Sequence, residues 1–200
     1  MTILSGQSIR ERGIFTPFSE RTKAFGLTYG LGPAGYDVRI DKTLSLRPGD
    51  FALAATMERM VMPDDVQAVV HDKSTWARRG LGLFNTVVDA GFYGWLTLEL
   101  KNQGHDNLTI EAGCPIAQMI FHLLDEPTNR PYAGRYQDAP RGATPAKLSY
   151  AITRAVEKHP DARRLFFYAI NERGELDQGC GRLAMQLGGE PAAAERTVTG

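Results

Sequence analysis

Short runs of alternating apolar and polar residues occupy much of the chain before residue 125. The clearest are residues 36–40, 51–56 and 95–100, and turn-forming residues such as Pro48-Gly49-Asp50 separate them. An alternation with a period of two indicates half-buried strands. Many short strands joined by Gly- and Pro-containing turns predict an all-β barrel or sandwich with little helix.

Two short helices and further strands complete this prediction. Residues 5–12 are predicted as a helix that Ser5 caps and Gly13 ends, and residues 75–79 as a helix that Gly80 ends. No long helical period occurs before residue 148, which argues against a doubly wound α/β fold. The other predicted strands are residues 66–71, 83–88, 108–110 and 116–124, with a turn at 89–94 joining 83–88 to 95–100 as a hairpin.

The character of the chain changes after residue 125. Residues 130–147 are polar and rich in turn formers, which indicates an arm rather than part of a core. Residues 149–159 favour a helix and residues 165–170 a strand that could return as a hairpin, whereas residues 188–200 have a disordered composition. We therefore expect a main domain at residues 1–145 and a C-terminal extension of unknown role at 146–200.

Charge and cysteine content narrow the function classes. The 23 basic residues balance the 23 acidic ones, which argues against non-specific nucleic-acid or anionic-membrane binding as the main role. Cys114 and Cys180 lie far apart and fit no metal-ligand spacing, so reduced thiols are expected. The N-terminus lacks the long apolar core of a signal peptide, and no run approaches membrane-spanning length. We expect a soluble cytoplasmic protein.

Residues 71–102 concentrate the candidate chemistry. Lys73, Ser74 and Thr75, followed by Arg78 and Arg79, supply cations, hydroxyls and helix N-terminal amides. Such groups suit phosphate oxygens through charge-assisted hydrogen bonds. The same residues also fit an ordinary capped helix with a solvated basic face, and the spacing alone leaves both interpretations open.

Two carboxylates follow in the same segment. Alternation places Glu99 on the face of its strand that Thr97 and Trp95 share, opposite three leucines. Glu99 fits either an exposed strand carboxylate or a general base in a partly closed pocket. Asp89 fits an ordinary turn residue, or a second carboxylate that the predicted hairpin would present to the same pocket.

Other chemistries lack their residues. Residues 30–35 fit neither the Rossmann nor the Walker pattern, and a tight turn is the better interpretation. No His-x-Glu is paired with Pro-Cys-x-x-Cys, which argues against a zinc-dependent deaminase. No G-x-S-x-G elbow occurs, and the four histidines show no ligand spacing.

Several motifs occur in an order that resembles one family. The segment Asp72-Lys73-Ser74-Thr75-Trp76-Ala77-Arg78-Arg79-Gly80 resembles the phosphate-binding motif of the dCTP deaminase branch of the dUTPase superfamily. Gly35-Tyr36-Asp37-Val38-Arg39 resembles its early motif, and residues 88–94 with 96–99 resemble its nucleoside-binding hairpin. Gly113, residues 115–118 and the pattern Tyr132-x-Gly-Arg135-Tyr136-Gln137 match its late motifs in order.

The resemblance implies a fold and a reaction. The fold is a mainly β, dUTPase-like distorted β-barrel of the β-clip type with few short helices, assembled as a homotrimer with active sites shared between subunits. The reaction is zinc-independent hydrolytic deamination of dCTP to dUTP and ammonia, which feeds dUMP and dTTP synthesis. The partners are deoxynucleoside triphosphates rather than nucleic acid or membrane. Mg²⁺ would bind through the substrate triphosphate, and no side chains are expected to hold a metal.

The resemblance also assigns roles to residues. Glu99 would be the general base that activates water for attack at C4. Ser74 and Arg78 would place that water, polarise the base region and bind phosphate. The other expected substrate ligands are Lys73 and Thr75 for the triphosphate, Asp89 for the 3′-hydroxyl, Thr97 in the nucleoside-binding hairpin, and Tyr132, Arg135 and Gln137 in an arm that closes over base and phosphates.

Three alternatives to a pure dCTP deaminase stay open from the sequence. An aspartate at the position of Asp89 can orient water onto the α-phosphate in dUTPases and in bifunctional deaminases. The chain could therefore be a bifunctional dCTP deaminase–dUTPase or a dUTP pyrophosphatase that yields dUMP. A non-catalytic nucleotide-sensing module that binds a partner through residues 146–200 is the further alternative.

Overall fold

The computed structural model describes residues 2–84 and 86–147. Within them, strands predominate and the helices are short, which confirms the prediction of a mainly β fold. The elements are β1 (Thr2–Ile3), α1 (Gly6–Glu11), β2 (Phe15–Thr16), β3 (Thr22–Ala24), β4 (Leu27–Leu31), β5 (Tyr36–Arg39), β6 (Leu44–Leu46), β7 (Phe51–Val61), β8 (Val66–Asp72), α2 (Ser74–Ala77), β9 (Leu81–Leu83), β10 (Val87–Val88), β11 (Tyr93–Asn102), β12 (Leu108–Ile110) and β13 (Pro115–Leu123).

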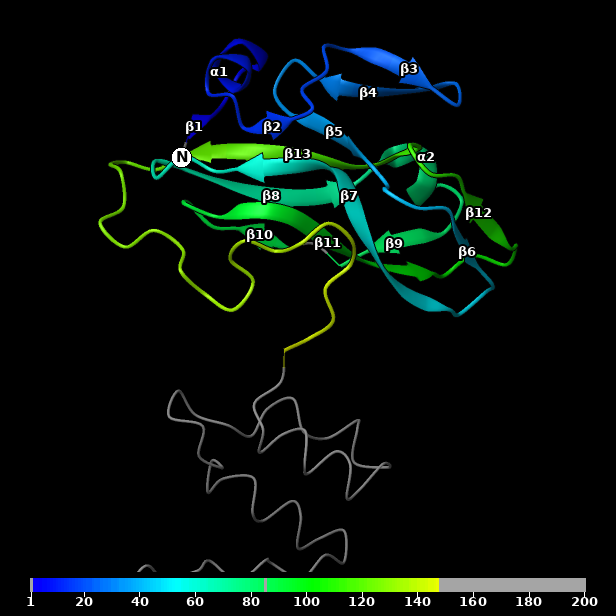
Figure 1. Ribbon diagram of the computed structural model, residues 1–200. Helices are drawn as coiled ribbons and strands as arrows, with labels where there is room; N and C mark the ends of the chain where they lie inside the picture. The colour runs from blue at the N-terminus through cyan, green and yellow to red at the C-terminus, as the bar shows by residue number, and fades with distance from the viewer. Residues whose placement is uncertain (1, 85, 148–200) are drawn as a thin grey trace, which may run out of the picture. The chain divides into compact units, whose positions relative to one another are not determined.

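The strands form two main sheets and a two-stranded ribbon (Figure 1). The larger sheet has the order β10-β8-β13-β5-β4-β3, with β1 added beside β13. The second sheet has the order β2-β7-β11-β9, and β12 pairs with β6 in the ribbon. Every pairing between these strands is antiparallel.

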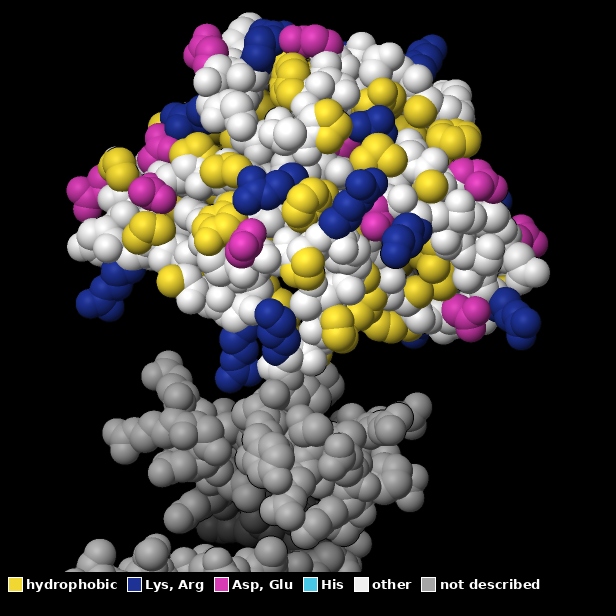
Figure 2. Space-filling view, in the orientation of Figure 1, with side chains coloured by type: hydrophobic (Ala, Val, Ile, Leu, Met, Phe, Trp, Pro, Cys, Tyr) yellow, Lys and Arg dark blue, Asp and Glu magenta, His cyan; other side chains and the backbone are white. Residues whose placement is uncertain are grey.

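The apolar core takes one face of each strand. In β11 the residues Leu96, Leu98 and Leu100 are buried, whereas Trp95, Thr97 and Glu99 between them are half-buried, as the alternation predicts. Full burial of a leucine side chain contributes about 1.5–3 kcal/mol, so a one-residue slip of this strand would be costly. On the face shown in Figure 2, hydrophobic and cationic side chains are interspersed.

Strand β7 continues beyond residue 56, where the predicted strand ends, and it contains a bulge at that point. The pairing with β11 shifts between Trp95 and Thr97, so that one residue of β11 faces three of β7. The buried Thr56 hydroxyl donates to the Glu58 carbonyl and accepts from the Leu96 amide, at 2.8 and 3.1 Å. Thr56 also forms an isolated antiparallel bridge to Ile40, which follows β5, so β7 contacts the strand region of the larger sheet here while it continues to pair with β11. Alternation cannot reveal such a bulge.

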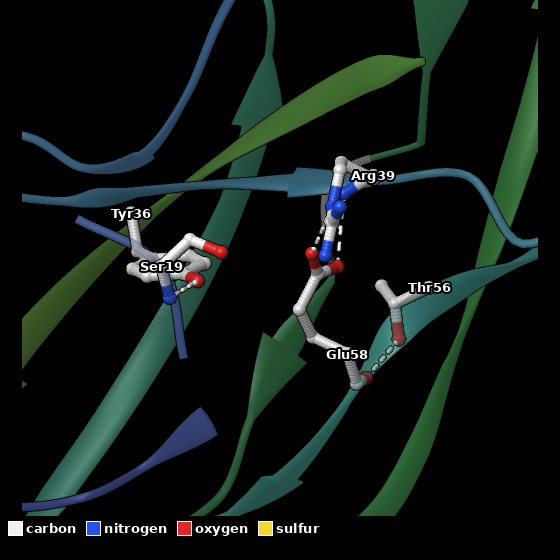
Figure 3. A network of polar contacts seen from close by, with 5 residues as sticks. All are labelled: Ser19, Tyr36, Arg39, Thr56 and Glu58. Carbon is white, nitrogen blue, oxygen red and sulfur yellow. Dashed lines mark hydrogen bonds and ion pairs between the residues drawn. The ribbon is translucent and has the colours of Figure 1, made fainter. Parts of the chain in front are cut away.

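Beside this bulge, a fully buried carboxylate meets a guanidinium (Figure 3). Arg39 Nε donates to Glu58 Oε1 at 2.7 Å, and the Arg39 main-chain amide donates to Oε2 at 2.9 Å. The guanidinium carbon also lies 4.4 Å from the centroid of the Tyr29 ring. These contacts satisfy a charge that would otherwise be expensive to bury.

The predicted strand at residues 83–88 and its hairpin with 95–100 are wrong. The Phe84 amide still donates to the Glu99 carbonyl, but residues 87–88 form β10, which pairs with β8 in the other sheet. The chain therefore changes sheets between the two short strands. Both halves carry apolar residues that face the core from either sheet, so the sequence pattern looks like one continuous strand.

The predicted short helices are confirmed. The Ser5 hydroxyl caps α1 by accepting from the Ser8 amide, and Gly13 follows with φ of 60°. Helix α2 has Arg78 as its C-cap, and Gly80 follows at φ of 84°. Residues 1–145 form one unit of the chain. The helix predicted at 149–159, the strand at 165–170 and the disordered end all lie outside the described residues.

No helix in the described part of the chain is long and apolar enough to cross a membrane.

Candidate functional site

A polar cavity of about 240 Å³ opens beside the first residues of α2. It is lined from β4 by Tyr29, from β5 by Asp37, from β13 by Gln118, and from the β8–α2 junction by Lys73 and Ser74, with seven further residues. Antiparallel pairing of β13 with both β5 and β8 brings these segments together. The early motif and the phosphate-type motif therefore share one cavity.

An ion pair forms part of the wall of this cavity. Lys73 is buried, and its Nζ donates to Asp37 Oδ2 at 2.7 Å. This bond uses one of the three ammonium protons, so further donors remain for an anion. The other oxygen, Asp37 Oδ1, is buried without a hydrogen-bond partner in the described structure. A buried carboxylate oxygen of this kind can accept from water or from a ligand.

The remaining polar residues of α2 are exposed. Ser74, Thr75, Arg78 and Arg79 all lie at the surface, and the Arg79 guanidinium lies over the Trp76 ring at 5.3 Å. Trp76 is buried, and its indole Nε1 donates to the Pro115 carbonyl at 2.8 Å. Trp76 thus anchors the helix while the hydroxyls and guanidinium groups face solvent.

Glu99 lies on the other sheet, on the outer face of β11. Its directly paired neighbour is Leu53 of β7, and Phe84 follows β9 beside it. Phe84 and Phe51 form an edge-to-face pair with centroids 6.0 Å apart, and both are more than half exposed. Partial burial in this apolar setting raises the pKa of the Glu99 carboxyl, and a hydrogen bond from its own main-chain amide opposes that rise to a smaller extent.

The arm already covers part of the same face. The Thr144 amide donates to the Thr97 hydroxyl at 2.9 Å, and the Trp95 amide donates to the Ala139 carbonyl at 3.1 Å. The predicted ligand Thr97 therefore has one acceptor position occupied by the arm. The arm therefore contacts β11 at Thr97, two residues before Glu99.

Asp89 is exposed at the start of the turn that precedes β11. The turn is fixed by main-chain bonds, including Phe92 to Asp89 at 3.2 Å and Met62 to Phe92 at 2.7 Å. Tyr132 stacks edge-on against Phe92, with centroids 5.9 Å apart, and its amide donates to the Ala90 carbonyl. Gln137 bonds to the same turn, whereas Arg135 lies exposed in the arm.

These predicted site residues form two groups in one chain. Lys73 and Ser74 line the cavity, with Thr75 and Arg78 beside them on α2, whereas Thr97 and Glu99 lie on β11 and Asp89 precedes it. Within the described residues, no hydrogen bond or ion pair joins Glu99 to Ser74, Arg78 or Asp89. Asp89 and Glu99 were expected to reach one pocket through a hairpin of residues 83–88 with 95–100. That hairpin does not form, because residues 87–88 pair with β8 instead.

Sequence reasoning missed several residues of these surfaces. Asp37 lies in the early motif, but the sequence predicts no role for it, and it predicts none for Tyr29, Gln118, Phe51 or Phe84. Only strand register places them, since Asp37 and Lys73 are 36 positions apart. Among the described residues, no group of three or more His, Cys, Asp or Glu side chains is placed to hold a metal ion.

The turn after Asp89 offers a stability prediction with an internal control. Gly91 has φ of +81°, and a Cβ there would meet Pro131 Cβ at 2.4 Å, whereas Gly49 has φ of +86° with nothing within 4 Å. We expect Gly49→Ala to cost about 1–2 kcal/mol of unfolding free energy, the left-handed penalty alone. Gly91→Ala should cost clearly more, because the arm must also move. Urea unfolding of both variants measures this difference, and equal losses would contradict the close packing of the arm.

A dCTP deaminase-like family model matches residues 36–124. The chain is 34% identical over 162 residues to a dCTP deaminase of Thermococcus sibiricus, covering 74% of this chain and 96% of that protein. It is 33% identical over 155 residues to a dCTP deaminase of Pyrococcus horikoshii, covering 70% and 94%. A protein of Persephonella marina named "dCTP deaminase, dUMP-forming" is 38% identical over 109 residues, covering 54% and 60%.

Solved structures give more distant similarities. The native dUTPase of EIAV is 19% identical with a TM-score of 0.46, over 61% of this chain and 97% of that one. The dUTPase of Staphylococcus bacteriophage 80alpha with dUpNHpp is 17% identical with a TM-score of 0.44, over 58% and 83%.

Proposed function

We propose that this chain, which belongs to the dCTP deaminase-like family, catalyses the hydrolytic deamination of dCTP to dUTP and ammonia. The family membership rests on relatives at least 30% identical that are matched over nearly their whole length. It confirms the resemblance inferred from the ordered motifs and the prediction of an enzyme of this family. The observation that carries the reaction is the half-buried Glu99 in its apolar surround.

Glu99 is proposed as the general base. A base works best when its pKa approaches the working pH, and partial burial raises the pKa of Glu99 from that of an ordinary glutamate. The carboxylate would take a proton from water as the water oxygen bonds to C4 of cytosine. It would then pass that proton to the amino group, so that ammonia leaves, and the proton of the new C4 hydroxyl would move to N3, so that a carbonyl remains. This cycle needs no metal-bound hydroxide.

The cavity beside α2 is proposed to hold the triphosphate. Lys73 keeps ammonium protons available after bonding to Asp37, and Ser74 contributes to the cavity wall. Charge-assisted hydrogen bonds of this type are the strong ones for phosphate oxygens. Thr75 and Arg78 lie exposed on the same short helix and are within the motif that resembles a phosphate site. Mg²⁺ is proposed to arrive bound to the phosphates rather than at a preformed protein site.

A second copy of the chain is proposed to complete the site, in a homotrimer. The supporting observation is that no described contact links Glu99 to the Ser74–Arg78 group. The Phe51–Phe84 pair beside Glu99 is more than half exposed, which is costly unless a neighbour or a substrate covers it. Bringing α2 of one copy against β11 of another would place hydroxyl, guanidinium and carboxylate around one base.

A bifunctional enzyme that also cleaves dUTP to dUMP is the second candidate. Asp89 is exposed and ready to hold either a sugar hydroxyl or a second water, and dUMP-forming relatives exist. Incubation with dCTP and Mg²⁺, followed by separation of the nucleotides, distinguishes the outcomes. We expect dUTP; accumulation of dUMP that disappears in Asp89→Asn would establish the bifunctional reaction. Unchanged dCTP would contradict both.

The raised pKa of Glu99 predicts the acid side of the pH–rate profile. The base must be ionised to accept a proton, so the rate falls as the pH falls through its pKa. Because burial raises that pKa in the free protein, we expect kcat/KM to decline at a pH above the ordinary glutamate value of 4.5. Stopped assays in constant-ionic-strength buffers, with circular dichroism to verify folding, test this. A rate that stays constant down to 4.5 would contradict a burial-tuned base.

A further inference from the structure

Residues 131–139, which we call the strap, lie alongside the turn that carries Asp89. The Tyr132 amide donates to the Ala90 carbonyl at 2.8 Å, and the Asp138 amide donates to the Tyr93 carbonyl at 3.0 Å. Ala139 then bridges to Gly94 in a parallel sense. The strap therefore contacts the turn at three places: before Gly91, between Gly91 and Gly94, and at Gly94 itself.

The Gln137 carboxamide makes two hydrogen bonds from the strap to the turn and a third within the strap. Its Oε1 accepts from the Tyr93 amide at 3.0 Å. Its Nε2 donates to the Gly91 carbonyl and to the Tyr132 carbonyl, both at 2.8 Å. Both N–H groups are therefore used within the protein. This arrangement does not suit the predicted role of Gln137 as a nucleotide ligand, because its donors point at main-chain oxygens.

The turn needs such external support. Gly91 and Gly94 adopt φ of +81° and +134°, and glycines of this kind leave a free turn with many accessible conformations. Gln137 ties the carbonyl of Gly91 and the amide of Tyr93 to one rigid planar group. A bond to either side of Phe92 fixes the direction in which the chain leaves Asp89.

We propose that Gln137 is a positioning residue that sets the preference of the site for deoxyribose over ribose, by holding the turn that carries Asp89. The proposal rests on the proposed function, in which Asp89 binds the sugar. Rejection of one extra hydroxyl depends on close packing and fixed hydrogen-bond partners, and small displacements of a positioning element have large effects. Loosening the turn would let the sugar pocket accept the 2′-hydroxyl.

The test uses two variants of the full chain in a Glu99→Gln background, so that nucleotides stay intact during binding. Gln137→Leu removes all three bonds, and Gln137→Glu keeps the size and the acceptor but places an oxygen against two carbonyls. Gln103→Leu is the control, since Gln103 is an exposed glutamine outside the turn and the strap. Calorimetry gives Kd for dCTP and for CTP, and hydrogen exchange follows residues 90–95.

We expect both Gln137 variants to reduce the ratio of CTP to dCTP dissociation constants about tenfold and to speed exchange in the turn about tenfold or more. Gln103→Leu should leave both unchanged. Weaker binding of both nucleotides with an unchanged ratio and unchanged exchange would overturn the proposal and make Gln137 a direct ligand. If the wild-type protein does not convert dCTP, the proposed reaction is wrong. Hydrogen exchange in the turn and the ratio of the CTP and dCTP dissociation constants still decide the role of Gln137.

Discussion

Glu99→Gln is expected to lower kcat for dCTP by at least about a hundredfold, since a positioned general base contributes about 10²–10⁴ in rate. Glutamine keeps the shape and cannot take a proton from water. The dissociation constant for dCTP should change little, because the proposed role of Glu99 lies in the transition state rather than in ground-state binding. Single-turnover kinetics with calorimetric binding separates the two quantities.

The stability of Glu99→Gln distinguishes loss of the base from loss of the fold, because the variant should lose activity without losing stability. A carboxyl whose pKa is raised in the folded state binds its proton more tightly there than in the unfolded chain. Stability is therefore lost as pH rises through the window between the unfolded and folded values, and the cost persists at neutral pH. Replacing the carboxyl by an amide removes that cost, so the melting temperature should hold or increase. An inactive variant with a clearly lower melting temperature would point to misfolding instead.

Arg39→Met is expected to cost about 3–5 kcal/mol of unfolding free energy, because it leaves the fully buried Glu58 without its cation. The main-chain amide of Arg39 would still reach Oε2, but it cannot neutralise the charge. The double variant Arg39→Met with Glu58→Gln should recover part of the loss, since no uncompensated charge then stays buried. Urea unfolding at fixed protein concentration measures the series.

The Arg10–Glu20 pair is the matched control for this prediction. It has the same 2.7 Å separation, but its side chains are 48% and 60% exposed. Solvent screens exposed pairs of this kind, so they contribute little to stability, and Arg10→Met should have a much smaller effect than Arg39→Met. Equal losses for Arg10→Met and Arg39→Met would show that burial is not what gives the Arg39–Glu58 contact its weight.

Alternation along the chain was sufficient to find the core side of β11, and with it the outward face of Glu99. Capping chemistry was sufficient to place α1, because Ser5 and Gly13 act within one helix. The ordered motifs identified the family from local residues alone. Each of these signals depends on neighbours a few positions apart.

The features that the sequence did not reveal depend on register between distant strands. The bulge at Thr56 and the change of sheet after Phe84 both follow from how strands pair, and the same alternation fits the unbulged, continuous alternatives. The Asp37–Lys73 pair likewise needs β13 between β5 and β8. Gln137 was identified as a candidate, but its bonds to Gly91 and Tyr93 could not be seen from residue type.

Turnover of dCTP in water enriched in ¹⁸O shows directly whether the protein hydrolyses the base at C4 and whether Glu99 is needed for it. Hydrolysis at C4 predicts that the wild-type protein yields a uracil nucleotide with the label on its base, together with ammonia, and that Glu99→Gln yields almost none. Label found only on phosphate oxygens, with the cytosine base intact, would contradict deamination by this site.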